Sequence, residues 1–342
     1  MDQKRLLQRH APTLEEVAHA AGVSRSTASR AINGGLKVSP SAQAAVDAAI
    51  AELGYIPNRA ARSLVTRRTD SLALVVPEPD ERVLTDPYFA GTLQGITAAL
   101  EPTTIQLILL IARRGEGSQR TASYLANRHV DGAVVVSHHR DDGLNQVLMD
   151  CGLPCVFVGR PWIGADQLPY VDSDNAHGAR LATEHLVAAG CTRIATIAGP
   201  LDMAAGVDRL AGWRAALHAA GLSDEAMARG DFTSAGGAAA MERLLAAYPD
   251  IDGVFAASDL MAAGAMGELS RQGRSVPGDV RVVGFDDLGV AVSTSPQLTT
   301  VHNPVVEMSR RAAELLLDIL GGGEEPDEPV IFQSELVVRD SA

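Results

Sequence analysis

The chain has 342 residues and a net charge of −13, with 46% hydrophobic and 4% aromatic side chains, so it is long enough for two or three domains with substantial cores. The charge is unevenly distributed. Residues 1–70 hold ten basic and six acidic side chains, a net of +4, and the remainder carries −17. A basic head on an acidic body is expected when only the head binds DNA phosphates.

The composition excludes a membrane-spanning protein, because no run of about 18 apolar residues occurs in the chain. The first residues, MDQKRLLQRHAPT, lack the apolar core and cleavage site of a signal peptide, which argues against export. The cysteines, Cys151, Cys155 and Cys191, are odd in number and lack zinc-ligand spacing. We therefore expect a cytoplasmic protein with reduced core thiols and with no metal or cofactor.

Residues 13–33, TLEEVAHAAGVSRSTASRAIN, predict two short helices joined by a turn. Thr13 and Glu16 have the spacing of a capping box, Gly22 ends the first helix and Ser24 begins the second. A helix-turn-helix places the first turn of its second helix in the major groove, where polar side chains contact base edges, although an ordinary helical hairpin has the same pattern. The candidate DNA-binding residues here are Thr13, Ser24, Arg25, Ser26, Thr27, Ser29, Arg30 and Asn33.

A third helix is predicted from Ser39-Pro40 to Leu53, where Ser39 is the cap, proline takes the first helical position and Gly54 follows the end. Three helices make residues 1–57 a small headpiece. Residues 58–70 are predicted to be a hinge helix and linker, too short to be stable alone and ordered only by DNA and a partner chain. Its arginines suit phosphates, and its leucine suits either a minor-groove wedge or packing against the headpiece. The candidates here are Asn58, Arg59, Arg62 and Leu64.

From residue 71 onward, short apolar runs alternate with amphipathic stretches. The runs are SLALVV, TIQLILLI, GAVVV, PCVFV, RIATIA, GVFAA and VRVVGF. Runs of this kind predict parallel sheets covered on both faces. About 270 residues of such alternation exceed one doubly wound domain, so we expect two lobes separated by a cleft. The predicted fold class is an all-α helix-turn-helix headpiece followed by α/β lobes with doubly wound parallel sheets.

Ligands of open α/β sheets bind outside the carboxyl ends of the strands, and the residues at those ends can be read from the sequence. We interpret Asp259 as the N-cap of a helix beginning at Leu260 and Asp287 as structural. The remaining set combines arginine, aspartate, hydroxyls and an aromatic ring, which suits a polyhydroxylated ligand. These effector-binding candidates are Ser137, Arg160, Phe232, Ser258 and Asp286.

A cluster of His138, His139, Asp141 and Asp142 could suggest a metal site. Two adjacent histidines do not easily share one ion, so we expect a solvated loop at the rim of the cleft. The chain has no nucleophile elbow, P-loop or Rossmann fingerprint, and no acid and nucleophile pair can be assigned. We therefore do not expect an enzyme.

The chain closely resembles the lactose-repressor (LacI/GalR) family of bacterial transcription regulators. The resemblance is carried by TLEEVAHAAGVSRSTASRAIN, VSPSAQAAVDAAIAELGYIPNRAARSL, DPYF, VDGAVVVS, VDSDNAHGARLATEHLVAAGCTRIATIAGP, DRLAGWRAAL, SDLMAAGAMGEL, VPGDVRVVGFDDL and SPQLTTVHNP. It implies that residues 71–342 form two periplasmic-binding-protein-like lobes that bind an effector and dimerise. The N-lobe would comprise residues 71–173 and 302–331, and the C-lobe residues 174–301 and 332–342.

By this resemblance, homodimers bind palindromic operator DNA, Arg25 and Ser26 read bases, and Leu64 enters the minor groove. An effector in the cleft then changes the hinge. The resemblance adds Arg209 and Phe89 to the effector candidates and also supports Phe232. The alternatives are a surface ion pair of Arg209 with Asp208 or Asp202, and lobe-core positions for the two rings. Ser258 stands where many members carry asparagine, which weakens transfer of a particular sugar specificity.

The expected function is therefore a repressor of a carbohydrate uptake or catabolic operon that responds to a sugar or polyol. The alternatives are a sugar-binding protein of a transport system and a regulator that responds to a nucleobase or other metabolite.

Overall fold

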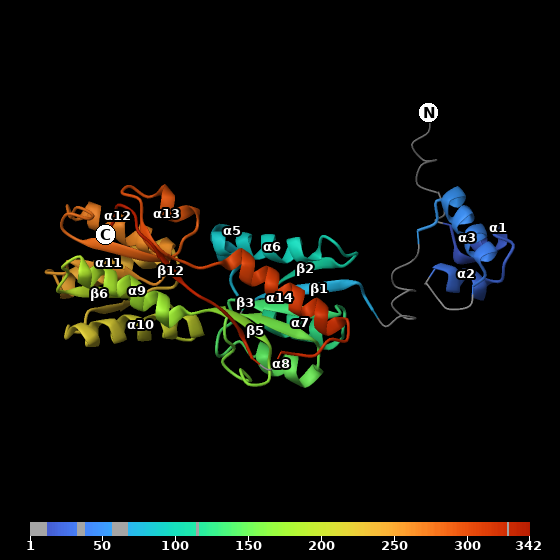
Figure 1. Ribbon diagram of the computed structural model, residues 1–342, viewed down its shortest axis with the longest axis horizontal. Helices are drawn as coiled ribbons and strands as arrows, with labels where there is room; N and C mark the ends of the chain where they lie inside the picture. The colour runs from blue at the N-terminus through green and yellow to red at the C-terminus, as the bar shows by residue number, and fades with distance from the viewer. Residues whose placement is uncertain (1–11, 33–37, 57–67, 114–115, 327) are drawn as a thin grey trace, which may run out of the picture. The chain divides into compact units, whose positions relative to one another are not determined.

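The computed structural model describes residues 12–32, 38–56, 68–113, 116–326 and 328–342 (Figure 1). By its internal contacts the chain divides into two compact units, Met1–Thr69 and Asp70–Ala342. Five of the predicted DNA contacts, together with most of the predicted hinge segment, lie outside the described residues. They are Asn33, Asn58, Arg59, Arg62 and Leu64.

In the described part of the first unit there are three helices, α1 (Leu14–Ala20), α2 (Arg25–Ile32) and α3 (Pro40–Leu53). The predicted caps are confirmed: Thr13 and Glu16 form a capping box on α1, and Ser39 caps α3 with proline in its first turn. Gly54 ends α3 in the left-handed conformation, at φ 63°. Small buried side chains from all three helices form one core, which consists of Val17, Ala18, Ala28, Ala31, Val46 and Ala49.

The second unit contains two six-stranded sheets. The sheet of the N-lobe is parallel throughout and has the order β11-β5-β4-β3-β1-β2. Its strands are β1 (Ser71–Val76), β2 (Gln106–Ile111), β3 (Gly132–Val136), β4 (Cys155–Val158), β5 (Tyr170–Ser173) and β11 (Val330–Phe332). Its helices are α5 (Asp80–Thr85), α6 (Pro87–Leu100), α7 (Glu116–Ala126), α8 (Leu144–Cys151) and α14 (Val305–Leu320).

The sheet of the C-lobe has the order β12-β10-β9-β8-β6-β7 and is parallel except for the pairing of β12 with β10. Its strands are β6 (Ile194–Ala198), β7 (Met227–Arg229), β8 (Gly253–Ala256), β9 (Arg281–Asp286), β10 (Thr299–His302) and β12 (Glu335–Val337). Its helices are α9 (Asn175–Ala188), α10 (Ala204–Ala220), α11 (Ser234–Ala247), α12 (Asp259–Arg271) and α13 (Gly289–Ser293).

Both faces of each sheet are covered, as the all-apolar strands predict. On β1, Leu72 and Leu74 pack toward α6 and α14, whereas Ala73 and Val75 pack into the core beneath α7 and α8. The helices approach closely where glycine allows it: a Cβ on Gly95 of α6 would lie 2.2 Å from a backbone oxygen of α14. The prediction of doubly wound parallel sheets is therefore confirmed.

The chain passes between the lobes after β5, after β10 and between β11 and β12 (Figure 1). Helix α14 belongs to the N-lobe, where it packs on α6, although it follows the C-lobe strand β10. The carboxyl ends of strands from both sheets consequently lie near the segments that cross between the lobes. Within the described parts of the chain, no helix is long and apolar enough to cross a membrane.

Candidate functional site

The exposed start of α2 is the candidate DNA interface of the first unit. Ser24, Arg25, Ser26 and Arg30 are exposed, and Thr27 and Ser29 are half-buried. The Ser24 hydroxyl caps the helix by accepting the Thr27 N–H at 3.1 Å. The structure therefore places these predicted contacts on one accessible helix and turn, with their backs against the headpiece core.

Arg25 forms an ion pair with Glu15, with 2.6 Å between Nε and Oε1, and its side chain is 70% exposed. An exposed pair of this kind contributes only about 0–1 kcal/mol, so it does not prevent the guanidinium from binding DNA. Thr13 is half-buried, and its hydroxyl is engaged in the capping box of α1. Arg25 is thus an accessible basic group at the start of the second helix.

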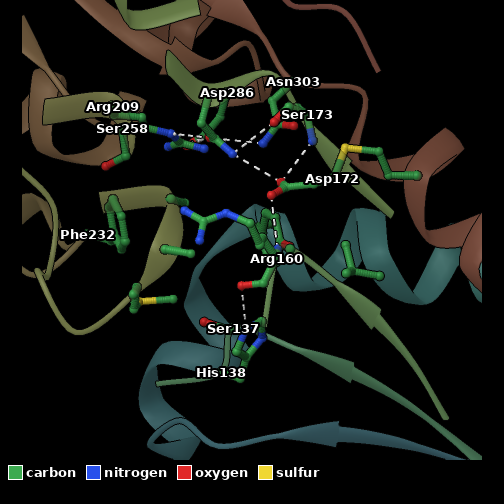
Figure 2. Close-up of a pocket in the computed structure, with 18 of the residues that line it drawn as sticks. Ser137, His138, Arg160, Asp172, Ser173, Arg209, Phe232, Ser258, Asp286 and Asn303 are labelled. Atoms are coloured by element: carbon green, nitrogen blue, oxygen red, sulfur yellow. Dashed lines mark hydrogen bonds and ion pairs between the residues drawn. The ribbon is translucent and has the colours of Figure 1, made fainter. Parts of the chain in front are cut away.

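A cavity lies between the two lobes, at the carboxyl ends of strands from both sheets (Figure 2). It encloses about 720 Å³ of space free of protein atoms, part of it open to solvent. Six of the seven predicted effector residues line it, and they come from both lobes. They are Ser137, Arg160, Arg209, Phe232, Ser258 and Asp286.

Arg209, on α10, is held inside the cavity wall by neighbours from three elements. Its Nε donates to Asn175 Oδ1 at 2.8 Å, and its Nη1 donates to the Ala257 carbonyl at 2.7 Å and lies 3.4 Å from Asp286 Oδ1. Its guanidinium also stacks on Phe285, 3.6 Å from the ring centroid. The side chain is buried, which excludes the alternative of a surface ion pair.

Asp172 and Asn175 connect this arginine to the N-lobe. Asn175 Nδ2 donates to Asp172 Oδ1 at 3.0 Å, and Asp172 Oδ2 accepts the Arg160 N–H at 3.0 Å (Figure 2). A continuous chain of hydrogen bonds therefore runs from the loop after β4, through the first crossing segment, to Arg209 in the C-lobe. It is the polar floor of the cavity.

The carboxylates of this floor are stabilised in their neutral forms by burial. Burial raises the pKa of Asp172 to about 6, against backbone N–H donors that lower it. Burial likewise raises the pKa of Asp286 to about 6, against the opposing charge of Arg209. Burial also raises the pKa of Asp86, the third carboxylate of the lining.

Arg160 carries an ion pair between the lobes. Its Nη2 donates to both carboxylate oxygens of Asp208 on α10, at 2.8 Å each. Both contacts come from one guanidinium nitrogen, which is shared between the two acceptor oxygens of the carboxylate in a charge-assisted pair. Arg160 therefore bridges the N-lobe and the C-lobe at the edge of the cavity.

The ring of Phe232 forms one wall of the cavity between two guanidinium groups. Arg82, on α5 of the N-lobe, lies 5.3 Å from the ring centroid, and Arg209 of the C-lobe lies 5.9 Å from it. Gly199 backs the ring, because a Cβ there would lie 2.3 Å from the Phe232 Cζ atom. The Phe232 ring can pack against the apolar face of a sugar, and the guanidinium groups beside it can donate to the hydroxyls at the edge of that sugar.

Three of the lining residues that are not glycine have positive φ: Ser137 at 53°, Phe232 at 64° and Asp286 at 119°. Such conformations cost about 1–3 kcal/mol each and concentrate at binding sites. Ser137 and Phe232 follow strands of the sheets, and Asp286 is the last residue of β9. The strained turn aims each side chain across the strand ends and into the cavity.

The structure corrects the assignment of Phe89. This ring is 2% exposed in the core of the N-lobe and does not line the cavity, whereas its neighbour Tyr88 does. Adjacent residues of a helix point about 100° apart, so only one of the two can face the ligand. The structure therefore shows the alternative given for Phe89, a position in the core of the N-lobe.

The predicted cap at Asp259 is also wrong. Ser258 is the N-cap of α12, and its Oγ accepts the Met261 N–H at 3.3 Å. The Asp259 carboxylate is instead buried, accepting from the Thr300 hydroxyl at 2.5 Å and the Leu288 N–H at 3.2 Å. It joins α12 to the C-lobe sheet.

The two histidines of the predicted solvated loop are buried, which contradicts that expectation. His138 lines the cavity, and its Nε2 lies 3.0 Å from the Arg160 carbonyl oxygen. His139 contacts carboxylates of both lobes, whereas Asp141 is exposed. In the part of the chain that the structure describes, no cluster of three His, Cys, Asp or Glu side chains could hold a metal ion.

Sequence reasoning missed several lining residues. Asp172 and Asn175 stand in VDSDN, a segment with a recognisable match but no assigned role, and Asp172 is near the carboxyl end of a four-residue strand too short to be seen in the pattern. Arg82 belongs to α5 and Asp86 is the cap of α6, and only Phe89 of the motif DPYF was considered there. The carboxyl end of a strand would have indicated Asp172 had that strand been predicted.

Comparison with known proteins gives the relationship. The family described as bacterial regulatory proteins, lacI family, matches residues 13–58, and the periplasmic binding protein-like domain matches residues 183–342. The HTH-type transcriptional regulator CelR of Thermobifida fusca is 50% identical over 339 residues, covering 98% of this chain and 99% of its own. This chain belongs to the LacI family.

Other LacI-family proteins agree along the whole chain. GalR of Escherichia coli is 33% identical, over 96% of this chain and 95% of its own. The solved CelR–cellobiose complex has a TM-score of 0.77 at 47% identity and covers 97% of this chain and 100% of its own. The lac repressor dimer bound to operator and an anti-inducer has a TM-score of 0.83 at 28% identity, covering 97% and 99%. The resemblance inferred from the sequence is confirmed, and this LacI-family chain is a DNA-binding transcriptional regulator.

Proposed function

We propose that this regulator represses a carbohydrate uptake or catabolic operon, and that a neutral sugar in the inter-lobe cavity sets its affinity for operator DNA. The protein acts as a homodimer on a palindromic operator in the cytoplasm, where its DNA is found. It needs no cofactor. The observation that carries the choice of ligand is the balance of charges in the cavity wall.

The charged lining consists of equal numbers of cations and carboxylates: Arg82, Arg160 and Arg209 against Asp86, Asp172 and Asp286. A phosphorylated or carboxylated metabolite would add negative charge to a site that already balances. Hydroxyl groups can both accept from guanidinium groups and donate to carboxylates, so they satisfy such a lining without adding charge. The ring of Phe232 supplies the apolar surface that covers a sugar face.

The CelR relative was solved in complex with cellobiose, a neutral disaccharide. We therefore choose cellobiose as the first effector to test. The sugar binds residues of both lobes, and its differential affinity for the closed arrangement provides the free energy that changes DNA affinity. Because the coupling is reciprocal, operator DNA changes sugar affinity by the same factor.

The test is operator binding by fluorescence anisotropy, with an inverted-repeat duplex selected from a random-sequence library. Cellobiose should shift the dissociation constant of this duplex at least fivefold, the lower end of typical allosteric coupling. Gluconate, glucose 6-phosphate and cytidine serve as anionic and nucleoside comparisons. A shift with gluconate or the phosphate but not with cellobiose would contradict the neutral-ligand assignment. A shift with cytidine alone would favour the alternative that the regulator responds to a nucleobase or other metabolite. A failure to bind any duplex at low salt would contradict the whole proposal.

A further inference from the structure

His139 lies between two carboxylates that belong to different lobes. It follows strand β3 of the N-lobe and is 6% exposed. Its Nε2 lies 3.1 Å from Glu78 Oε1, at the end of β1 in the same lobe, and its Nδ1 lies 2.9 Å from Asp202 Oδ2, in the loop between β6 and α10 of the C-lobe. The imidazole ring therefore spans the interface between the lobes.

The hydrogen bonds determine the charge of this ring. Glu78 Oε1 also accepts from the Ser137 hydroxyl at 2.7 Å and from Arg82 Nη1 at 2.5 Å, so Glu78 is an ionised acceptor. A neutral imidazole can donate from only one of its nitrogens. A ring whose two nitrogens both face carboxylates donates from both and is an imidazolium. His139 and its partners thus form a charged bridge, carboxylate–imidazolium–carboxylate.

The other titratable groups around the ring do not reverse this charge. Asp142 of the same loop accepts the His139 backbone N–H at 2.8 Å and adds negative charge, whereas Arg82 of α5 and Arg140 of the loop are positive and His138 is buried. Burial of the neighbouring His138 lowers its pKa, so that ring is neutral. The hydrogen bonds and charges of Glu78 and Asp202 raise the pKa of His139 above its usual 6.5, although burial opposes them.

We propose that His139 is a positioning residue for the effector response: as an imidazolium it clamps Asp202 of the C-lobe to Glu78 of the N-lobe, so that closure of the lobes over the sugar takes up a proton. The clamp is reinforced by the backbone, because the Arg140 N–H donates to the Asp202 carbonyl at 2.8 Å. The part that concerns the sugar rests on the function proposed above. No assigned effector contact includes this histidine.

The sign of the pH dependence follows from linkage. Opening the lobes separates Asp202 from the ring and returns the pKa of His139 toward its usual value, so the closed state binds the proton more tightly. Between the two pKa values, sugar affinity falls by up to tenfold for each unit of rising pH, the limit for one linked proton. Below this window both states are protonated and above it neither is, so the dependence on His139 vanishes.

The experiment is calorimetric titration of the full-length protein with cellobiose at pH 7.5, in phosphate and in Tris. The two buffers differ in ionisation enthalpy, so the difference in binding heat counts the protons taken up. At this pH, above the pKa values of about 6 of Asp172 and Asp286, those cavity carboxylates are largely ionised. Wild type should take up a fraction of a proton per chain, and H139Q should take up less and bind cellobiose more weakly.

Two further variants distinguish the effect of the His139 charge from that of its contact with residue 202. In D202N an amide can donate to Nδ1 of a neutral ring while Nε2 still donates to Glu78, so this variant should keep most of its affinity and lose the pH dependence. H218Q removes a histidine that is 64% exposed on α10 and should behave as wild type. Equal proton uptake in wild type, H139Q and D202N would overturn the proposal.

Histidine NMR of the full-length protein provides a test that does not depend on the sugar. The ring resonances of His139, assigned by their loss in H139Q, should titrate above pH 6.5 with both nitrogens protonated, and D202N should lower that midpoint. If cellobiose fails to bind, the proposed effector is wrong and the NMR titration alone decides the role of His139. A midpoint at or below the usual value would overturn the clamp whatever the calorimetry gives.

Discussion

Replacing Asp286 by asparagine should stabilise the protein and weaken its response to the effector. The carboxylate is on the last residue of β9, lines the cavity and has its pKa raised to about 6 by burial, from an ordinary 3.8. This shift already includes the attraction of Arg209, so it measures the net cost of holding the charge in the folded chain. At about 1.36 kcal/mol for each pKa unit, the cost above pH 6 is about 3 kcal/mol.

The amide fits the position. Asp286 Oδ1 accepts from Asn303 Nδ2 at 3.3 Å, and asparagine keeps this acceptor. Asn303 Oδ1 is buried with no hydrogen-bond partner, so a donor on the neighbouring side chain is tolerated there. Asparagine also adopts positive φ more readily than most residues, and φ at this position is 119°. The substitution therefore removes a charge without a change of shape.

The stability difference between D286N and wild type should depend on pH. Between pH 3.8 and about 6 the folded wild type retains a proton that the unfolded chain releases, so wild-type stability falls as pH rises through this window. D286N lacks the group, and its advantage in stability should grow from about 2 kcal/mol at pH 5 to about 3 kcal/mol at pH 8.

Urea unfolding followed by tryptophan fluorescence measures this stability in the second unit, because Trp162 and Trp213 are the two tryptophans of the chain. Cellobiose affinity should fall by about 10- to 100-fold with the loss of a charged acceptor worth about 1.5–3 kcal/mol. A loss of stability at pH 8, or a stability difference equal at pH 5 and pH 8, would refute this reasoning.

Three further substitutions test other parts of the chain. R82M removes a cation of the cavity lining and should weaken cellobiose binding about tenfold, whereas R113M, at an arginine that is 64% exposed, should bind as wild type does. G199A places a Cβ 2.3 Å from the aromatic wall and should likewise weaken binding about tenfold or more in calorimetry. Its control is G267A, on a helix surface with no atom within 4 Å of the new Cβ, which should leave binding unchanged and stabilise the helix by up to about 1 kcal/mol. R25A should change which operator bases are preferred, by about 1–3 kcal/mol at the contacted position. Uniform weakening across a duplex library would mark Arg25 as a phosphate contact instead.

Sequence signals were reliable where the structure depends on interactions between residues close together in the chain. The capping box at Thr13, the proline start of α3 and the end of α3 before Gly54 are all set within one helical turn, and all were predicted. The central strands β5 and β10 were missed, and the strands β1, β2, β3, β4, β6, β8 and β9 were predicted from their apolar runs. The edge strands β11 and β12 were not, because each has three residues and is defined by pairing with a strand far away in the chain.

The histidine pair shows where a local interpretation fails. Read alone, HHRDD is a polar stretch and suggests a solvated loop. His139 is nevertheless buried, because Asp202, 63 residues later, returns from the other lobe to accept from its ring. Polar side chains can be buried only when such partners exist, and partners so distant in the chain leave no periodic trace around the histidine.

The sequence by itself determined the helical headpiece, the doubly wound lobes and five of the cavity residues, because helix caps, apolar periodicity and strand ends are properties of neighbouring residues. The family resemblance supplied the sixth cavity residue, Arg209. Only the tertiary structure decided that Tyr88 and not Phe89 faces the cavity, and that Asp172, Asn175 and Arg209 form one chain of hydrogen bonds. Those relations depend on how two sheets and the segments that cross between them meet in space. The energies concerned are those of burial and of pairing between distant groups, which exist only once the lobes have folded.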